Sequence, residues 1–315
     1  MIRNRYLIAG LAVAILVSAV AGCERQSPQR KPRGAPREEP TISLYMHDSG
    51  EIKNIKMEDY IAGVVAAEME PTWPENALAA QAIKARTFTM ENIEAGRMQE
   101  LRGADASTNI EEFQAYDPTR INDRIRNAVS KTRGEVVTYR GEYIRAWFSA
   151  CDGGVSATAE EGLGFTKEPA PYLRAGARDN CLEITVPENR SWEVRVPLLR
   201  VREAVRSVTG RDPGAIASVE ISRQGSSGRA EELTFNGVQV SGPSLRLALG
   251  STEVRSMLLS EISIQGDSLL LRGRGFGHGV GMCQWGANKL AQEGKSPEDI
   301  IRFYFKGVEI PKLWE

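Results

Sequence analysis

One glutamate, Glu68, stands where a carboxyl group can act as an acid near neutral pH. It follows Ile61, Val64 and Val65 at the i, i+3, i+4 and i+7 spacing of a single helical face. A carboxyl group at the end of such an apolar stripe loses hydration, which raises its pKa because the charged form is disfavoured. This environment favours proton donation to a leaving group; the alternative is a helix-end carboxylate held in a structural ion pair.

A second stretch that could bind a ligand alternates glycine with other residues from Gly273 to Gly281. In a regular extended strand the glycines would share one face, and Arg274, Phe276 and His278 would lie on the other. The glycine spacing matches neither a phosphate-binding loop nor a dinucleotide-binding fingerprint. A bulged packing strand is the alternative for the stretch, and a structural role is the alternative for His278, one of two histidines in the chain.

The first residues predict export. Arg3 and Arg5 precede an apolar run over residues 6–21, which is short for a membrane span and is typical of a secretory signal. Residues 20–23, Val-Ala-Gly-Cys, are similar to a bacterial lipobox, which implies diacylation of Cys23 and cleavage just before it. We therefore expect an extracytoplasmic protein anchored to a membrane by lipid, with an ordinary secretory peptide as the alternative.

Three cysteines remain once Cys23 is assigned to the lipid anchor: Cys151, Cys181 and Cys283. In a compartment that permits disulfides, an odd number cannot all pair. We favour a Cys151–Cys181 disulfide with Cys283 free. The alternative is that all three are small buried hydrophobic residues.

The composition is that of a globular protein, with 41% hydrophobic and 26% charged residues among 315 and a net charge of −1. Such a charge argues against a nucleic-acid partner. Residues 24–40 are polar and carry four prolines, as expected of a semi-rigid tether. We predict a signal peptide over residues 1–22, a lipid-anchored tether over 23–40 and a folded part over 41–315.

The elements that must position these residues form an α+β pattern. A helix over residues 57–69 carries Glu68, and a second helix begins near Pro74 and ends near Gly96. A hairpin with its turn at Arg140-Gly141 follows, and further alternating segments lie between residues 194 and 271. We predict N-terminal helices plus antiparallel sheets in one domain that could be divided into two lobes.

Three stretches together resemble the stage II sporulation protein D family, which also includes proteins described as amidase enhancers. They are YIAGVVAAEM at residues 60–69 with WPENALAAQAIKARTF at 73–88, FSACDGGVSATAEE at 148–161 with PYL at 171–173, and GRGFGHGVGMCQWGA at 273–287. The resemblance extends over nearly all residues from Tyr45 to Gly307. It implies lytic cleavage of peptidoglycan glycan strands, in sporulating members after removal of the stem peptides, with the catalytic glutamate at Glu68.

On that resemblance we hypothesise that Glu68 first protonates the departing sugar and then removes a proton from the muramic acid C6 hydroxyl, leaving a 1,6-anhydro end. Hydrolysis stays open, because four glutamates could supply a second carboxylate: Glu70, Glu75, Glu160 and Glu161. The alternative function is a non-catalytic protein that grips glycan and stimulates a partner amidase or other cell-wall hydrolase.

The resemblance also implies substrate-binding residues. The candidates are Gln81, Lys84, Arg86, Ser149, Arg274, His278 and Gln284. Gln81 and Arg86 are five residues apart on one helix, so at most one of them is expected to point at Glu68. His278 and Gln284 are expected to contact substrate or to orient Glu68.

Some relatives carry a histidine and cysteines between the second helix and the hairpin, a plausible zinc site. The corresponding stretch here, residues 103–116, has neither residue type. We therefore expect no structural zinc and no cofactor. If zinc did bind, its ligands would come from Cys151, Cys181, His278 and Cys283, which have no recognisable metal-binding spacing.

Overall fold

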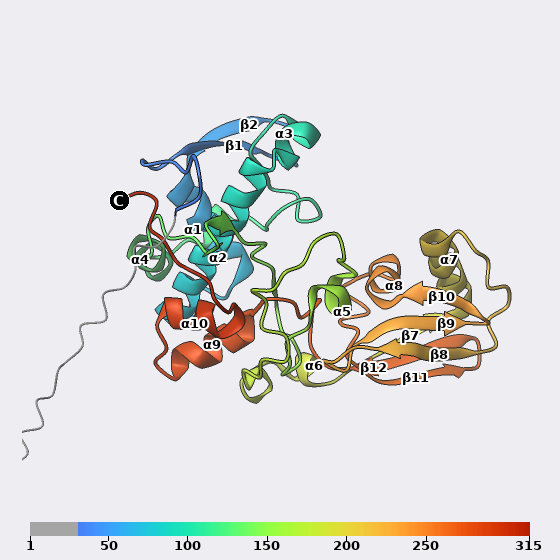
Figure 1. The fold of residues 1–315 in the computed structure, drawn as a ribbon. Helices are drawn as coiled ribbons and strands as arrows, with labels where there is room; N and C mark the ends of the chain where they lie inside the picture. Colours follow the sequence, from blue (N-terminus) through green and yellow to red (C-terminus); the bar gives the residue numbers. More distant parts are fainter. Residues whose placement is uncertain (1–30) are drawn as a thin grey trace, which may run out of the picture.

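The computed structural model describes residues 31–315 and arranges them around two hydrophobic cores (Figure 1). Helices dominate one end of the molecule and strands dominate the other, with irregular segments between them (Figure 1). The predicted signal peptide and Cys23 lie outside the described residues. The predicted α+β class is confirmed, since helices occur together with mainly antiparallel sheets.

The helical end contains Glu68 and Gln284, which follows the glycine-rich stretch. Its helices are α1 (Met57–Glu68), α2 (Glu75–Glu94), α3 (Arg97–Arg102), α4 (Asp123–Lys131), α9 (Gln284–Gln292) and α10 (Pro297–Tyr304). Its strands are β1 (Thr41–Tyr45), β2 (Ile52–Lys56), β3 (Ala106–Ser107), β4 (Thr138–Tyr139), β5 (Glu142–Tyr143), β6 (Phe148–Ser149) and β13 (Met282–Cys283).

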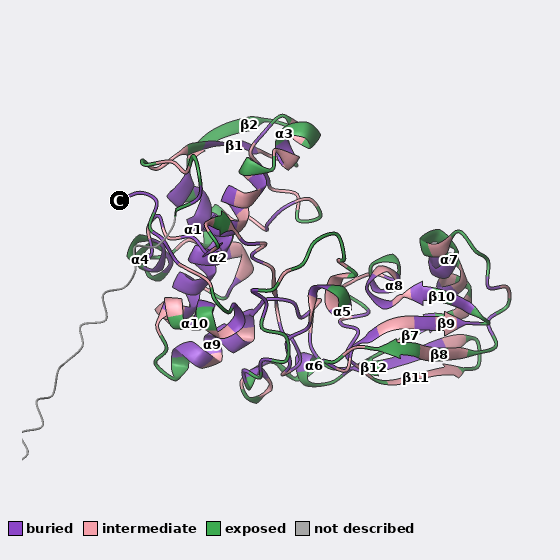
Figure 2. Ribbon diagram, viewed as in Figure 1, coloured by how far each residue is buried: buried purple, intermediate pink, exposed green. Residues whose placement is uncertain are grey.

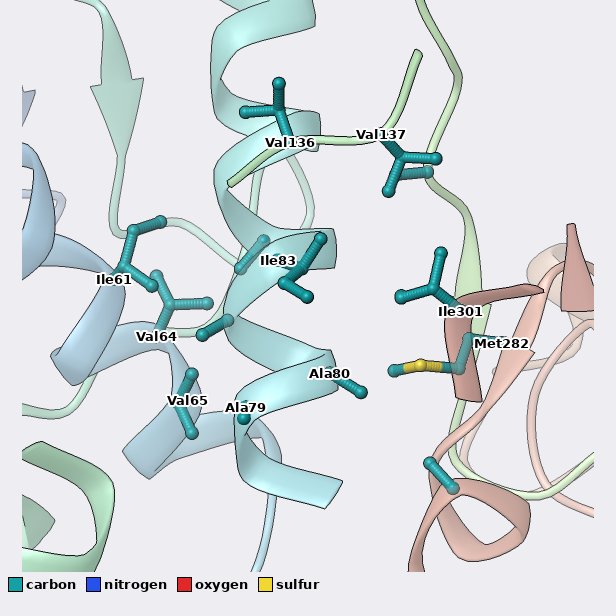
Figure 3. Close-up of a cluster of buried hydrophobic side chains, with 14 of the residues drawn as sticks. Ile61, Val64, Val65, Ala79, Ala80, Ile83, Val136, Val137, Met282 and Ile301 are labelled. Atoms are coloured by element: carbon teal, nitrogen blue, oxygen red, sulfur yellow. The ribbon is translucent and has the colours of Figure 1, made fainter. Parts of the chain in front are cut away.

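Helix α2 is the centre of this end because its surface is made of small side chains. Five alanines of α2 are completely buried: Ala77, Ala79, Ala80, Ala82 and Ala85. Small residues let neighbouring backbones approach, and α1, α4, α9 and α10 all pack on α2. Figure 3 shows Val65 of α1 beside Ala79 of α2 within one cluster of buried side chains, and Figure 2 colours most of both helices as buried.

The other end is built from antiparallel strands. One sheet has the order β10-β9-β8 and the other β11-β12-β7. The strands are β7 (Trp192–Pro197), β8 (Val219–Gln224), β9 (Ala230–Phe235), β10 (Val238–Ser241), β11 (Leu259–Gln265) and β12 (Ser268–Gly273). Helices α7 (Leu198–Thr209) and α8 (Gly242–Ala248) complete the second core, which includes Val205, Leu233 and Leu245.

The connecting region holds short elements: α5 (Ala159–Leu163), α6 (Pro187–Arg190) and the 3₁₀ helix η2 (Cys181–Glu183), whereas the 3₁₀ helix η1 (Pro118–Arg120) precedes α4. Strands β6 and β13 pair in parallel as Met282↔Phe148 and Cys283↔Ser149, which are partners 134 residues apart in the chain. This pairing brings the second family-like stretch alongside the third.

The end of the predicted tether differs from expectation. Residues 31–40 lie against the folded part, where the Glu39 carboxylate accepts a hydrogen bond from the Glu58 N–H at the start of α1 (3.0 Å). Glu39 also pairs with Arg133, and Lys31 donates to the carbonyl of Leu313 (3.3 Å). The physical reason is that the first turn of α1 has unpaired N–H groups, which Glu39 satisfies. Within residues 31–315, no helix has the length and apolarity needed to cross a membrane.

Candidate active site

Glu68 is the last residue of α1 and is half-buried. Its Oε1 accepts a hydrogen bond from the main-chain N–H of Ala115 (3.0 Å), and the side-chain amide of Gln284 donates to its Oε2 (3.4 Å). Burial raises the pKa of Glu68, whereas Lys84 and these two donors act in the opposite direction. The negative end of the α1 dipole also disfavours the carboxylate.

The alternative of a structural ion pair at Glu68 finds no support. Among residues 31–315, no lysine or arginine nitrogen lies within 4.0 Å of the Glu68 carboxylate. A partly exposed carboxyl with two hydrogen-bond donors and a raised pKa is equipped to release a proton and to take one back.

Lys84 of α2 supplies the positive charge that acts on Glu68. Its side chain is completely buried, its Nζ donates to the Gln114 side-chain oxygen (3.0 Å), and it lies 3.2 Å from the centroid of the Phe148 ring. Burial lowers the pKa of Lys84 to about 7, and the nearby Glu68 opposes that shift. Lys84 acts on Glu68 through its charge. Lys84 has no exposed surface in the described structure, which gives no support to the prediction that it binds substrate directly.

The segment over residues 103–116 contributes to the site in a way that the sequence did not suggest. It was notable only for lacking zinc ligands, but its Gln114 holds Lys84 and its Ala115 N–H binds Glu68. Gln114 is itself fixed by a hydrogen bond to the Thr89 hydroxyl (3.1 Å). No periodicity or motif marks these residues, because main-chain donors carry no side-chain signature.

Gln284 contacts Glu68 because it directly follows β13, which holds this part of the chain in place. It is the first residue of α9, whose N-cap is Cys283. The parallel pairing of β13 with β6 fixes the start of this helix, and the Gln284 side chain is 5% exposed. Gln284 therefore orients Glu68, one of the two roles expected for it.

Two tryptophans beside these residues form an aromatic pair that the sequence reading missed. Trp73 follows Glu68 in the α1–α2 loop, and Trp285 follows Gln284. Their rings meet edge to face with centroids 4.7 Å apart, and both are half-buried. An exposed aromatic face next to a polar centre can pack on the apolar face of a ring-shaped ligand.

The glycine-rich stretch is not the regular strand that its alternation predicted. β12 ends at Gly273, and Gly275, Gly277, Gly279 and Gly281 all have φ between 72° and 105°. A Cβ on Gly279 would lie 2.0 Å from the Arg229 guanidinium, and one on Gly281 2.1 Å from the carbonyl of Trp147. The glycines thus allow a tightly turning chain to pack against the β6 region.

His278 has a structural position within this stretch. Its Nδ1 accepts a hydrogen bond from the Val280 N–H (3.0 Å), and it also bonds the main chain of Phe148. Burial, with Arg246 and then Arg229 nearby, lowers the pKa of His278 to about 3. The neutral form of the ring is therefore favoured, and its hydrogen bonds to the main chain of Val280 and Phe148 hold the turn against β6.

Arg86 and Gln81 do not meet Glu68. Arg86 is completely buried and forms a two-pronged ion pair with Glu58 (Nη2–Oε2 2.6 Å, Nε–Oε1 3.1 Å), so its role is structural. Gln81 is also completely buried, and neither of its amide atoms has a hydrogen-bond partner among the described residues. The complete burial of Arg86 and Gln81 gives no support to the prediction that they bind substrate, which stays a prediction.

Ser149 and Arg274 lie on either side of the same turn region. Ser149 pairs with Cys283 through β6, but its hydroxyl is buried and has no partner within residues 31–315. Arg274 is exposed and donates to the carbonyl of Gly153 (3.0 Å), beside a cavity that it lines with Gln224 and Ser191. Neither contacts Glu68 in the described structure.

The four glutamates considered as a second carboxylate are engaged elsewhere. Glu70 pairs with Arg120 (3.3 Å), Glu75 with Lys131 (3.9 Å) and Glu160 with Arg223 (3.1 Å). Glu161 forms a capping box at α5 and accepts a hydrogen bond from the Ser227 N–H (2.9 Å). Of Glu68 and these four glutamates, Glu68 alone lies between the Ala115 N–H and the Gln284 amide within residues 31–315.

The predicted Cys151–Cys181 disulfide is not formed. Cys151, Cys181 and Cys283 are all free and buried, and the Cys151 and Cys181 sulfurs are 3.5 Å apart, whereas a disulfide needs about 2.05 Å. The physical reason is that three sulfurs, not two, converge at one point of the core.

Comparison with known proteins relates the chain to a family of sporulation proteins. A family model described as "Stage II sporulation protein" matches residues 45–139, which include Glu68, Lys84 and Ala115. The chain is 31% identical over 266 residues to an uncharacterized protein of Brachyspira hyodysenteriae, covering 82% of this chain and 67% of that protein.

Two relatives with descriptive names come from Bacillus subtilis. Stage II sporulation protein D is 28% identical over 302 residues, covering 86% of this chain and 78% of that protein. The amidase enhancer is 25% identical over 297 residues, covering 79% of this chain and 40% of the relative.

Proposed function

The chain belongs to the stage II sporulation protein D family, and from that premise we propose that it is a peptidoglycan lytic transglycosylase in which Glu68 is both acid and base. The proposal is carried by the environment of Glu68: a partly exposed carboxyl with a raised pKa, between the Ala115 N–H and the Gln284 amide. The names of the relatives, stage II sporulation protein D and amidase enhancer, are compatible with a substrate in the peptidoglycan.

The first step requires a protonated Glu68. Burial and the α1 dipole favour the neutral acid, which donates its proton to the glycosidic oxygen as the bond to the anomeric carbon breaks. The carboxylate left behind is stabilised by the Ala115 N–H, by the Gln284 amide and by the positive charge of Lys84. It faces the cationic sugar carbon and offsets the charge that develops there.

The second step regenerates the acid. The Glu68 carboxylate removes the proton from the C6 hydroxyl of the muramic acid residue, and that oxygen forms a bond to the anomeric carbon of the same ring. The nucleophile belongs to the substrate, so one carboxyl suffices and no water needs to be activated. The engagement of Glu70, Glu75, Glu160 and Glu161 elsewhere supports this one-carboxyl route over hydrolysis.

The tryptophan pair gives the site a surface for sugar rings. Trp73 and Trp285 follow Glu68 and Gln284 closely in sequence, and their rings form one aromatic patch. The C–H face of a pyranose packs on such a surface, while its hydroxyls stay free for polar contacts. We propose that this pair binds a sugar next to the bond that is cut.

The predicted secretory signal and lipid anchor at Cys23 fit this function, because the substrate lies outside the cytoplasm. We propose that the mature chain is held at a membrane surface by lipid. Labelling with a radioactive fatty acid, lost in Cys23→Ala, is the expected result. Unlabelled wild-type protein would rule out the anchor but leave the catalytic proposal intact.

The second candidate function is a glycan-binding enhancer of an amidase, which the name of one relative favours. The two functions differ in their need for an ionisable group at residue 68. Glu68→Gln keeps the shape and most hydrogen bonds but cannot donate and recover a proton. An enzyme loses activity on this change, whereas a binding protein keeps its function.

The test compares wild type, Glu68→Gln and the control Glu70→Gln, which changes an exposed carboxyl two residues away. Each is incubated with intact and with peptide-stripped peptidoglycan, and released fragments and bound protein are both measured. We expect fragments from wild type and Glu70→Gln only, with equal glycan binding by all three. Absence of fragments from all three, with binding and amidase stimulation retained, would refute the enzyme and support the enhancer.

A further inference from the structure

Three thiols from distant parts of the chain converge in the helical core. Cys151 follows β6, Cys181 begins η2 and Cys283 ends β13. Each is at most 1% exposed, and their sulfur atoms all lie within 4.8 Å of one another. Zinc bound by sulfur at about 2.3 Å in a tetrahedron holds its sulfurs about 3.8 Å apart, so this cluster has nearly the size that a zinc ion requires.

Two buried carboxylates border the same point. Oxygens of Asp152 and Asp179 lie within 4.8 Å of each other and of the Cys181 and Cys283 sulfurs. Asp179 uses both oxygens, accepting from the Cys181 N–H (3.0 Å) and from the Tyr304 hydroxyl (2.7 Å).

Asp152 has an unused oxygen. Its Oδ1 accepts from the Gly154 N–H (2.8 Å) and lies 3.3 Å from the Cys181 sulfur. Its Oδ2 is buried and has no hydrogen-bond partner among residues 31–315, although the residue is completely inaccessible to solvent. A buried carboxylate oxygen without a partner is costly, and a bound cation beside the carboxylate would offset that cost.

No neighbouring side chain neutralises the Asp152 carboxylate directly. The buried Arg229 is close, but its Nη1 and Nη2 donate to the main-chain carbonyls of Val155 (3.0 Å) and Asp152 (2.6 Å). Within residues 31–315, no arginine or lysine nitrogen lies within 4.0 Å of the Asp152 carboxylate oxygens. A cation bound between the sulfurs and the Asp152 carboxylate would supply the missing charge.

Main-chain N–H groups also point at sulfur. The Cys283 Sγ accepts hydrogen bonds from the Asp152 N–H (3.3 Å) and the Gly286 N–H (3.2 Å). Such donors stabilise a thiolate ligand and fix its orientation around a metal. Gly286 is needed for this packing, since a Cβ there would lie 1.7 Å from Asp179 Oδ2.

We propose that Cys151, Cys181, Cys283 and the carboxylate of Asp152 bind one zinc ion in a closed structural site. Three thiolates and one carboxylate suit zinc, which prefers four ligands and soft sulfur donors, and none of the four ligand residues is exposed to substrate. This proposal differs from the prediction of no structural zinc. Of the four residues named in the sequence analysis as candidate zinc ligands, the three cysteines are included and His278 is not.

A zinc ion at this site would hold in place the segment that positions Gln284. Cys283 precedes Gln284 directly and pairs with Ser149, so a metal at this point fixes the strand that carries Gln284 to Glu68. The ion would join β6, η2 and β13 much as a disulfide would, and binding energy would be added to folding stability. Only this last link to Glu68 rests on the proposed function.

The test is elemental analysis of the full chain, purified without chelators, together with titration of its thiols. We expect one zinc per chain, with the three thiols unreactive until a chelator removes the metal. Replacement by Co²⁺ should give the thiolate charge-transfer absorption of a tetrahedral sulfur site, a readout on the wild-type chain that no folding defect can obscure.

The matched variants are Asp152→Asn and Asp179→Asn, which remove the same charge from neighbouring buried positions. Asp152→Asn should weaken zinc binding by about tenfold or more, whereas Asp179→Asn should retain the metal. Three results would overturn the proposal: a Cys151–Cys181 disulfide in metal-free protein, three reactive thiols without zinc after incubation with zinc chloride, or equal zinc loss in both variants. None depends on glycan cleavage, so failure here is separate from failure of the proposed function.

Discussion

Replacing Arg86 tests whether this residue supports the fold or binds substrate. Its guanidinium is completely buried and donates to both carboxylate oxygens of Glu58. The Oε1 atom of Glu58 also accepts hydrogen bonds from the Gly134 N–H (3.1 Å) and the Trp314 indole (2.9 Å). Arg86 further donates to the carbonyl of Glu135 (2.8 Å). This network ties α1 and α2 to the C-terminal residues of the chain.

The loss of unfolding free energy expected for Arg86→Met follows from the burial of the ion pair. Arg86→Met keeps most of the side-chain volume but leaves the Glu58 carboxylate, whose side chain is 10% exposed, without its cation. Removing one partner of a buried ion pair costs about 3–5 kcal/mol of unfolding free energy. For a chain of this size that corresponds to a fall in melting temperature of roughly 6–20 °C.

The assay is thermal unfolding followed by circular dichroism, with glycan binding measured well below the transition. Arg86→Met should melt much earlier but bind glycan normally while folded. The double variant Glu58→Gln/Arg86→Met should recover part of the loss, because the unpaired charge is then gone. An Arg86→Met variant that has the melting temperature of wild type and loses only glycan binding would refute the structural role of Arg86.

Three further predictions concern the site itself. Because burial raises the pKa of Glu68, the stabilising contribution of this group is complete below its unfolded pKa and is lost as pH rises through its folded pKa. The melting temperature of Glu68→Gln minus that of wild type should therefore grow from about pH 4 to pH 8. A difference that stays constant with pH would contradict the raised pKa. Gln284→Leu removes a hydrogen bond to a charged group and should lower kcat by about tenfold to a hundredfold with little change in KM on peptide-stripped strands; an effect confined to KM would show that Gln284 binds substrate instead. Trp285→Ala should raise KM while leaving kcat nearly unchanged, and an unaltered KM would remove the tryptophan pair from the sugar-binding surface.

Local features of the fold were predictable because local sequence determines them. The helix carrying Glu68 was expected over residues 57–69 and ends at Glu68, one residue early. The hairpin turn at Arg140-Gly141 is present with positive φ at both residues, although the strands beside it are only two residues long. Ser296 caps α10 through the Asp299 N–H, as serine before proline indicates.

Residues two positions apart in α2 show what the sequence could not reveal. Lys84 and Arg86 are both long, cationic and completely buried, yet Lys84 meets Gln114 and Arg86 meets Glu58. These partners come from other elements, so helical spacing alone could not assign the roles. The prediction for the glycine-rich stretch was wrong for a related reason. Alternation predicts a strand, but the close approach of the stretch to the β6 region requires positive φ at four of the glycines in the stretch.

The cysteines illustrate the limit for long-range clusters. Cys151, Cys181 and Cys283 are separated by 30 and more residues, and none of the short spacings that mark zinc sites is present. Counting cysteines favoured a disulfide, whereas the parallel pairing of β6 with β13 brings the third sulfur to the other two. Only the tertiary structure shows that Asp152 contributes an unpartnered oxygen at the same point.

The most direct test of the central claim is the mass of the glycan ends that the purified chain produces in water enriched in heavy oxygen. If Glu68 transfers the proton from the C6 hydroxyl, the new ends are anhydro-muramic acid, lighter by one water than hydrolysed ends and free of heavy oxygen. Reducing ends that carry heavy oxygen would contradict the account, because water and not the substrate's own hydroxyl would then be the nucleophile.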